Sequence, residues 1–384
     1  MSSSSPTTAG PAPLSVTALA SRRDMRDFLA LPRRLYADDP AWIAPLELEL
    51  RQRFSPRSHF LRHARWQGWL ARRSGRVLGR ITAQLDRLEP QRGLGYFGMF
   101  EAEDDPAVAR ALFAAASAWL RGQGATRVRG PLNLHMNEEV GLLVDGFATP
   151  PSVLMGHARP YYGTLLRDAG LQPVKDLLAY RIPPDFEAPT VMQRLAERAS
   201  KRVRVRPFRR DRAEEDALIM RDIFNDAWSG NWGFSPMDRD EWQDTVRTLI
   251  RLMPDGYVQI AELDGEPVAF IVALPNLNEA ARDLGGRLLP FGWLRFLWRL
   301  KVRHPRSARV PLMGVRRAQQ QSRLGPTLAF LVIDALRLEL QRRGVREVEM
   351  SWILEDNSGM RNIIETIGGD AYKRYRLYEM PLSD

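Results

Sequence analysis

Polar side chains gather in one stretch in the first half of the chain, residues 130–163. Its glutamates and histidines could act as general bases, because burial can tune a carboxylate or an imidazole toward neutral pH. Glycines, prolines and apolar residues separate these groups, which indicates a built site, although an ordered loop packed on its domain fits equally well. The candidate bases are Glu138, Glu139, His135 and His157, and the candidate substrate contacts are Asn133, Asn137, Tyr161 and Tyr162.

A loop in the second half has the chemistry of a phosphate site. The apolar stretch 311–315 runs into the polar loop 316–325, and a helix is expected to begin at Pro326. A helix start offers unpaired N–H groups and the positive end of the helix dipole, and the arginines of the loop add permanent charge. Gly325 would let the backbone approach a ligand closely. Basic loops before helices are also common as solvated surface, so that alternative stays open.

The elements that would position these groups follow a similar order twice. In the first half we expect helices over 21–36, 106–123 and 161–169, and strands over 66–71, 77–85, 95–100, 127–132 and 175–182. In the second half we expect helices over 212–228, 238–252, 326–343 and 357–367, and strands over 203–208, 257–263, 267–274, 309–315, 345–352 and 372–380. An antiparallel meander followed by a βαβ unit in both halves predicts a duplicated α/β fold of the α+β type.

These elements divide the 384 residues into two domains of ordinary size. A disordered tail without the features of a signal peptide is expected over 1–13, a first domain over 14–183, a linker over 184–201 and a second domain over 202–384. An insertion over 276–308 separates two strands of the second domain.

The second domain resembles the GNAT (Gcn5-related N-acetyltransferase) superfamily. The coenzyme loop of that family has the form [QR]-x-x-G-x-[GA], which Gln320 and Gly325 match at its ends, whereas Arg323 replaces the first glycine. A later family motif, an Asn followed by a Gly about eleven residues on, matches Asn357 and Gly368. The phrases GLLVDGF, MGHARPYY and KDLLAY also resemble tandem GNAT proteins of the bacterial ceramide synthase group. The resemblance implies two tandem GNAT-like domains, each with a mixed, mostly antiparallel sheet flanked by helices.

The same resemblance implies a coenzyme A thioester, acyl-CoA or acetyl-CoA, as co-substrate of the second domain. Backbone groups of 313–315 would hold the pantetheine arm, amides of 321–325 the pyrophosphate, and Asn357, a plausible helix N-cap, the arm beyond. The full set is Met313, Gly314, Val315, Arg316, Gln320, Gln321, Ser322, Arg323, Leu324, Gly325 and Asn357. In this family the amine attacks the thioester directly and a tyrosine protonates the thiolate. Tyr375 is the candidate acid, although the tyrosines of 372–378 could equally serve strand packing.

The corresponding loop of the first domain, 101–106, carries four carboxylates, which would repel a pyrophosphate. The first domain is therefore expected to serve the acceptor side.

The insertion combines aromatic and basic residues in one predicted helix within 288–301. Apolar residues from Phe291 to Trp298 would share one face and Arg295, Arg299 and Arg303 another, which is typical of an interfacial helix or of the lid of an apolar channel. Trp293 and Trp298 are the candidate lipid contacts. A core-packed amphipathic helix is the alternative, and the aromatic content favours a lipid substrate.

Composition narrows the function further. The chain has no cysteine, which excludes thiolate metal sites and a Cys nucleophile, and its five histidines show no metal-binding spacing, so no metal is expected. The net charge of +10 is spread over many arginines instead of clustering with aromatic residues, so we expect no nucleic-acid partner. No apolar run is long enough for a transmembrane helix. A cytoplasmic protein is expected, at most peripheral at the inner membrane through contact with anionic lipid.

These observations predict an acyl-CoA-dependent N-acyltransferase that moves a fatty acyl group to the amine of a sphingoid base, with ceramide as product. Three alternatives stay open: acetyl transfer to a small amine or peptide, a non-catalytic acyl-CoA or lipid-binding protein, and transfer from an aminoacyl-tRNA.

Overall fold

Short-range signals position the predicted hairpins and helix starts. The computed structural model describes residues 12–55, 58, 60–136, 138–234, 236–237, 239–250, 253–322 and 324–382. The turns at Ser74-Gly75 and Asp264-Gly265 have positive φ at both residues, as two-residue hairpins of type I′ require. Asp105 caps its helix by accepting from Ala107 N at 2.9 Å, and Asn357 caps another by accepting from Met360 N at 3.1 Å. The predicted hairpins and the Asn357 cap are therefore confirmed.

The elements of the first half agree in order with the prediction. They are β1 (Leu14–Ala18), α1 (Arg22–Leu35), α2 (Glu47–Arg53), α3 (Phe60–His63), β2 (Ala64–Arg73), β3 (Arg76–Asp86), β4 (Leu94–Ala102), α4 (Pro106–Gly122), β5 (Arg127–Gly130), β6 (Leu142–Asp145), α5 (Tyr162–Asp168) and β7 (Gln172–Ile182).

The second half repeats the order with additional short helices. Its elements are α6 (Thr190–Ala199), β8 (Val203–Pro207), a 3-10 turn (Arg210–Arg212), α7 (Ala213–Trp228), α8 (Arg239–Ile250), β9 (Val258–Leu263), β10 (Glu266–Pro275), α9 (Leu277–Ala281), α10 (Gly292–Trp298), a π turn (Arg299–Arg303), β11 (Ser307–Val315), α11 (Arg317–Gln320), α12 (Gly325–Arg342), β12 (Glu347–Leu354), α13 (Ser358–Thr366) and β13 (Asp370–Pro381).

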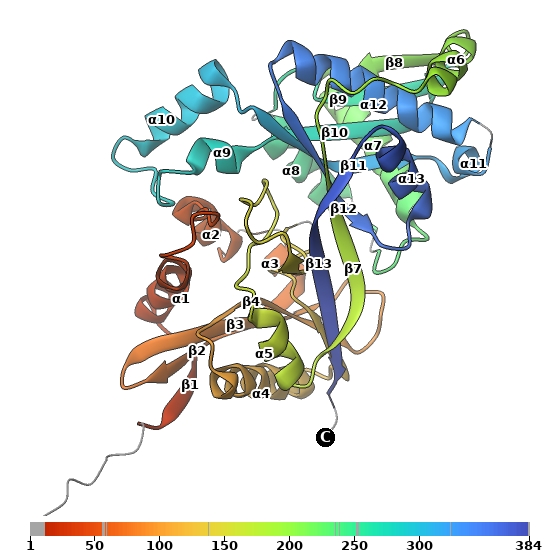
Figure 1. Ribbon diagram of the computed structural model, residues 1–384. Coiled ribbons are helices and arrows are strands. Elements are labelled where there is room, and N and C mark those ends of the chain that lie inside the picture. Colours follow the sequence, from red (N-terminus) through yellow and green to blue (C-terminus); the bar gives the residue numbers. More distant parts are fainter. Residues whose placement is uncertain are drawn as a thin grey trace, which may run out of the picture.

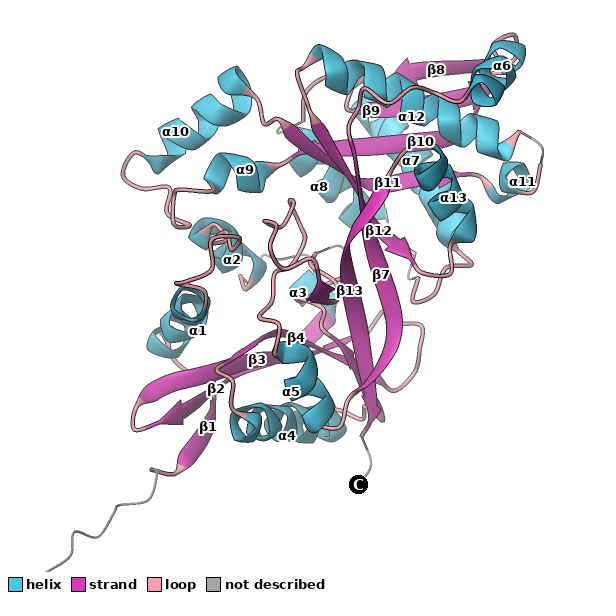
Figure 2. Ribbon diagram, in the orientation of Figure 1, coloured by secondary structure: helices cyan, strands magenta, loops and turns pink. Residues whose placement is uncertain are grey.

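The two halves exchange their last strands. The sheet order is β1-β2-β3-β4-β5-β13-β7-β12-β11-β10-β9-β8, with β6 paired to β13. Strand β13, from the end of the chain, pairs with β5 of the first half, and β7 pairs with β12 of the second half. The two exchanged strands run side by side between the halves (Figure 1). One mixed, mostly antiparallel sheet flanked by helices therefore runs through the whole protein (Figure 2).

Helices cover the sheet on both faces in the second half. Helix α12 packs on one face over a core that includes Leu328 and Val332, and α7 and α8 pack on the other over Phe224 and Trp242. In the first half, α4 packs on the sheet through residues such as Leu112 and Leu120. The alternation of buried and exposed positions, not any single motif, holds these layers together.

Two segments differ in detail from the expectation. The predicted linker 184–201 contains helix α6, whose inner side is near α12. The helix expected within 288–301 is shorter, because α10 ends at Trp298 and continues as the π turn. Most of the tail expected over 1–13, together with Asn137 and Arg323, lies outside the described residues.

Candidate active site

Strands β11 and β12 part in the middle of the sheet. They pair in parallel only from Ser307 to Val310 on β11. Beyond that point β11 keeps only its partner β10, and β12 continues against β7, with Ile353 opposite Leu178. The edge of β11 from residue 311 to 315, which includes the predicted pantetheine contacts, therefore faces a gap between strands that is open for a ligand.

The loop after β11 is already hydrogen-bonded within itself. The amides of Gln321, Ser322 and Gly325 donate to Arg317 O, Gln319 O and Ser322 O at 3.4, 2.9 and 3.2 Å. Leu324 N donates to Ser322 Oγ at 3.1 Å. The amides predicted to hold a pyrophosphate must therefore exchange these bonds before they can bind one.

Side chains of the same loop also have protein partners. Gln320 Nε2 donates to Val315 O at 2.7 Å, and Arg316 Nε donates to Pro267 O at 2.9 Å. Arg317 donates from its backbone to Asp226 at 2.8 Å and from its side chain to Ser229 at 3.1 Å. The structure thus gathers the predicted coenzyme residues around one gap, and their roles stay predictions.

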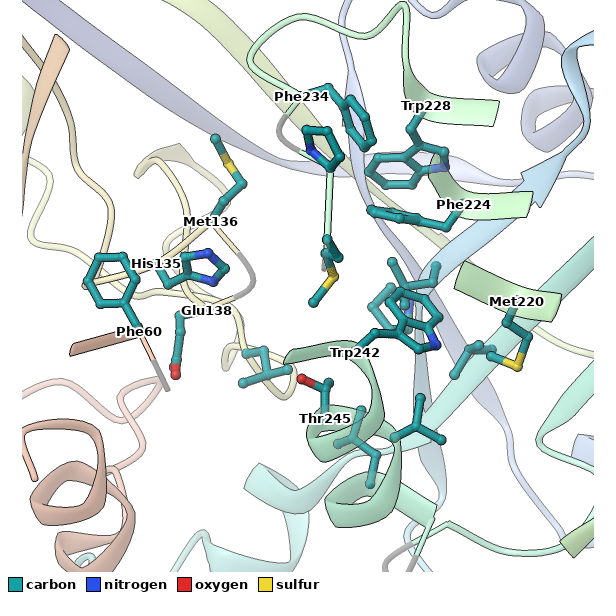
Figure 3. A pocket seen from close by; sticks show the side chains of 18 of the residues that line it. Phe60, His135, Met136, Glu138, Met220, Phe224, Trp228, Phe234, Trp242 and Thr245 are labelled. Carbon is teal, nitrogen blue, oxygen red and sulfur yellow. The ribbon is translucent and has the colours of Figure 1, made fainter. Parts of the chain in front are cut away.

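A first cavity, cavity 1, lies beside this gap and has a volume of about 510 Å³. Its wall in the second half is apolar and is built by α7, α8 and the strands β9 to β11; it includes Met220, Phe224, Trp228, Phe234, Trp242, Val246, Val258, Val272 and Leu312. Its opposite wall comes from the first half and includes Phe60, His135, Met136 and Glu138. Figure 3 shows the two walls facing one another across the cavity.

Glu138 is the charged group with the most useful chemistry in this cavity. Arg53 on α2 lies 2.7 Å from its carboxylate and 3.7 Å from Glu139, and Glu49 is 2.7 Å from the other side of the same guanidinium. Burial raises the pKa of Glu138 to about 7, against the lowering effect of Arg53 and with help from the neighbouring Glu49. A carboxylate with this pKa is suited to accept a proton near neutral pH.

His135, the other predicted base in cavity 1, is a weaker proton acceptor. Its ring lies 5.1 Å from that of Phe60, and burial lowers its pKa to about 4. It is therefore neutral at pH 7 but holds a proton poorly. The structure brings His135 and Glu138 to the same cavity, as the sequence pattern suggested.

A second cavity, cavity 2, has a volume of about 410 Å³ and lies mainly in the first half. Residues of α1, α2, the insertion and the 151–157 segment give it apolar walls. Its polar floor centres on Glu101, which accepts from Tyr36 Oη at 2.9 Å and from Tyr162 Oη at 2.7 Å. Glu139 also lines this cavity and accepts from Asn133 Nδ2 at 2.7 Å.

Glu101 was expected among the loop carboxylates at a helix start, and the structure places it elsewhere. It lies within β4, and Arg80 is 3.6 Å away. Burial raises the pKa of Glu101, against the lowering effects of Arg80 and the two tyrosines. Of the four carboxylates in 101–106, only Asp105 caps α4.

The two cavities meet at the Arg53 cluster. Both are lined by Glu49, Gln52, Arg53, Leu154, Leu249 and Met253. Glu138 faces cavity 1 and Glu139 faces cavity 2, with Arg53 between their carboxylates. A ligand in each cavity would therefore reach the same group of charges.

The remaining predicted residues lie at different distances from this junction. His157 lines cavity 2 and its Nε2 lies 2.9 Å from Asp39, and burial lowers its pKa. Tyr161 donates to Ala102 O at 2.9 Å. Tyr375 is fully buried outside both sets of lining residues, and burial holds its pKa well above the ordinary value. Trp293 and Trp298 are 43% and 52% exposed and line neither cavity.

Sequence reasoning missed two buried arginines that organise the site. Arg53 is far from Glu138 in the sequence and stands in an ordinary charged helix, so no local pattern marks it. Arg309 lines cavity 1 beside the strand gap, where its Nε donates to Ser351 Oγ at 2.8 Å and its Nη1 donates to Val153 O at 3.0 Å. An arginine within an otherwise apolar strand was the available signal for Arg309.

Two searches over the described part of the chain found nothing. No group of three or more His, Cys, Asp or Glu residues there could hold a metal ion. No described helix combines the length and the apolar character needed to cross a bilayer.

Comparisons with known proteins place the chain in a family. No family model matches it. Protein YghO of Escherichia coli (strain K12) is 46% identical over 368 residues, which cover 95% of this chain and 94% of that protein. The protein named bacterial ceramide synthase of Caulobacter vibrioides is 45% identical over 377 residues, covering 97% and 98%.

The fold has a parallel among solved structures. The tandem GNAT protein from the clavulanic acid biosynthesis pathway superimposes with a TM-score of 0.58 at 16% identity, covering 97% of this chain and 99% of that one. At this identity the likeness concerns the fold, and it confirms the expected tandem GNAT architecture. The chain is therefore an N-acyltransferase of tandem GNAT fold and belongs to the family that contains YghO and the bacterial ceramide synthase.

Proposed function

We propose that the protein transfers a fatty acyl group from acyl-CoA to the amine of a long-chain base and releases an N-acylated lipid of the ceramide type. The observation that carries this proposal is the geometry of cavity 1, which joins the open edge of β11 to a large apolar chamber and to Glu138. The name of the 45% identical relative, bacterial ceramide synthase, supports the same substrate class. A small amine and an acetyl group would leave most of both cavities empty.

The donor fits the second half. The coenzyme would lie along the gap between β11 and β12, with its thioester near Pro311 and Leu312, which line cavity 1. The acyl chain would then enter the apolar chamber between α7, α8 and the sheet, whose walls contain Phe224, Trp242 and Val272. Each methylene buried there stabilises the complex by about 0.8 kcal/mol.

The acceptor fits cavity 2. An ammonium group is attracted by the carboxylates of the junction, and the polar floor at Glu101 offers hydrogen bonds to hydroxyl groups of a long-chain base. The hydrocarbon part would lie along the apolar walls built by α1, α2 and the insertion. Asn133, Tyr162 and His157 are the predicted contacts that line this cavity.

The chemistry requires two proton movements. Glu138 takes a proton from the ammonium, and the freed amine nitrogen attacks the thioester carbon. The carbon–sulfur bond then breaks, the electron pair leaves with sulfur, and the second amine proton reaches the thiolate. Tyr375 remains the proposed acid by family resemblance, although its hydroxyl is enclosed in protein, and Glu139 remains an alternative base.

The first test is an assay with several donors. The purified protein would be incubated with a sphingoid base and acyl-CoAs of increasing chain length, while free thiol and lipid products are followed by mass spectrometry. We expect thiol release to rise with chain length and an N-acylated base to form. Release with acetyl-CoA alone would indicate small-molecule acetylation instead. Donor binding without turnover for any amine would indicate a binding protein, and a need for charged tRNA would indicate aminoacyl transfer.

A further inference from the structure

The most exposed apolar surface in the described part of the chain belongs to the insertion. Leu289 and Phe291, in the loop before α10, are 80% and 74% exposed, and Val302 in the π turn is 65% exposed. On α10 itself, Trp293, Leu294, Leu297 and Trp298 are each more than 40% exposed. We call these seven residues the apolar patch. More than half of the large apolar side chains that the described residues expose lie within this short segment.

The helix is two-sided, so the patch is not a frayed core. Trp293 and Leu297, and likewise Leu294 and Trp298, are spaced by four residues and form two adjacent rows on one face. Phe296 on the other face is buried with Leu300 against α9, next to Ala281. Helix α10 therefore has one anchored face and one apolar face directed away from the protein, and it projects from the body beside α9 (Figure 1).

Charge around the patch has one predominant sign. The insertion contains seven arginines and lysines but only two acids, Glu279 and Asp283. Glu279 accepts bonds from the backbone of Arg306 and Ser307 at 3.0 Å, and Asp283 is paired with Arg299 and, at 3.5 Å, with Arg295. The acids are thus engaged locally. Arg287, Lys301 and Arg303 remain exposed beside the apolar patch.

The anchored face of the insertion also forms part of cavity 2. Leu288 and Phe296 line that cavity, together with Leu277 and Ala281 of α9. The same short segment therefore presents an apolar, basic surface to the outside and roofs the proposed acceptor site on the inside. A lipid leaving a bilayer at this surface has a short apolar path into cavity 2.

We propose that the insertion is a docking surface for an anionic phospholipid bilayer and that it delivers the lipid amine from the bilayer to cavity 2. Aromatic and aliphatic side chains enter the boundary between head groups and acyl chains, while the surrounding cations bind the anionic head groups. The delivery step rests on the proposed function, whereas the docking itself requires no catalysis.

The absence of cysteine from the chain allows a direct test. Phe291→Cys gives a single labelling position for an environment-sensitive dye, and Val191→Cys on α6, where the valine is 67% exposed, gives the matched control. With vesicles of phosphatidylglycerol and phosphatidylcholine that carry nitroxide-labelled acyl chains, we expect quenching at position 291 and none at 191. Equal signals at both positions, or none at 291, would overturn the proposal. A change at 291 that follows protein concentration without vesicles would show that a second copy of the chain covers the patch.

Charge reversal tests the electrostatic part. Lys301→Glu with Arg303→Glu should weaken sedimentation with anionic vesicles about tenfold or more. Arg194→Glu with Arg198→Glu, two exposed arginines on α6, changes the net charge equally and should have little effect. An equal loss in both pairs would indicate diffuse attraction by net charge and would contradict a localised docking surface.

The two proposals fail in distinguishable ways. Vesicle binding through the patch without acyl transfer would leave the docking surface standing and remove the proposed function. Acyl transfer with a base presented in detergent, together with no vesicle binding, would keep the function and overturn the docking surface.

Discussion

The two halves of the sheet build the same junction and then use it differently. In each half two parallel strands start paired, β4 with β5 and β11 with β12. In the first half the following chain fills the space: Leu132 N donates to Phe97 O at 2.8 Å, and Asn133 Oδ1 accepts from Met99 N at 2.7 Å. In the second half the strands diverge after Val310 and leave the β11 edge open. A duplicated fold thus offers one coenzyme gap, and the first half is left to supply the acceptor side and the base.

The largest expected effect concerns the base that the first half contributes to the gap of the second. Glu138→Gln keeps the shape of the side chain but removes its ability to accept a proton. We expect kcat to fall by about 10²–10⁴-fold, as for the loss of a general base, while donor affinity changes little. The measurements are steady-state kinetics and calorimetric binding of acyl-CoA.

Glu197→Gln, an exposed position on α6, is the matched control and should keep full activity. If Glu138→Gln also kept full activity, Glu139 would become the candidate, and inactivity of neither variant would remove the proposed base altogether.

The filled junction of the first half should be intolerant of any added atom. A β-carbon at Gly98 would lie 1.8 Å from the carbonyl oxygen of Leu132, so the backbone would have to move. We expect Gly98→Ala to lower the free energy of unfolding by about 3 kcal/mol or more in urea denaturation. Gly122→Ala in α4 meets nothing within 4 Å and should raise it by about 0.5–1 kcal/mol. Similar effects at both positions would contradict the close packing described for the first junction.

The raised pKa of Glu138 predicts a pH dependence of kcat/KM. Only the carboxylate accepts a proton, and burial places its pKa at about 7. Activity should therefore fall about tenfold for each pH unit below 7 and level off above it. Glu138→Gln should abolish this limb. A wild-type profile that is flat from pH 5 to pH 8 would contradict the assignment.

The open gap of the second half should lose function when it is filled. Leu312→Trp places a bulky ring at the diverging strands beside cavity 1. We expect acyl-CoA affinity to fall about tenfold, which corresponds to about 1.4 kcal/mol, because the ring competes with the coenzyme arm. In contrast, Leu132→Ala, at the first junction, should destabilise the fold by about 2–5 kcal/mol but leave donor affinity and a single donor per chain. Weakened donor binding in Leu132→Ala alone would reverse the assignment of the two halves.

Local signals in the sequence were sufficient for much of the fold. Hairpin turns such as Asp264-Gly265 and caps such as Asn357 depend on neighbouring residues, and both were predicted from the sequence. The pairing of β13 with β5 was not, because strand exchange is decided by contacts between residues about 250 positions apart. The insertion was recognised from its aromatic and basic residues, but the length of α10 was not.

The candidate site follows the same division. His135 and Glu138 stood out as polar groups in a stretch rich in glycine and proline, and the structure brings both to cavity 1. Arg53, which pairs with Glu138 at 2.7 Å, comes from another helix and carried no mark in the sequence. The charge pair and the meeting of the two cavities arise only when α2 packs beside the 130s loop, so they required three-dimensional information.

The exchanged strands have a consequence for how the protein is made in the cell. On the ribosome, the first half is synthesised long before residues 370–381, yet its strand β5 waits for that segment as a neighbour. The nascent first half must therefore tolerate an open sheet edge until translation is nearly finished. Ribosome-bound chains that stop short of β13 should consequently depend on chaperones more strongly than full-length chains do.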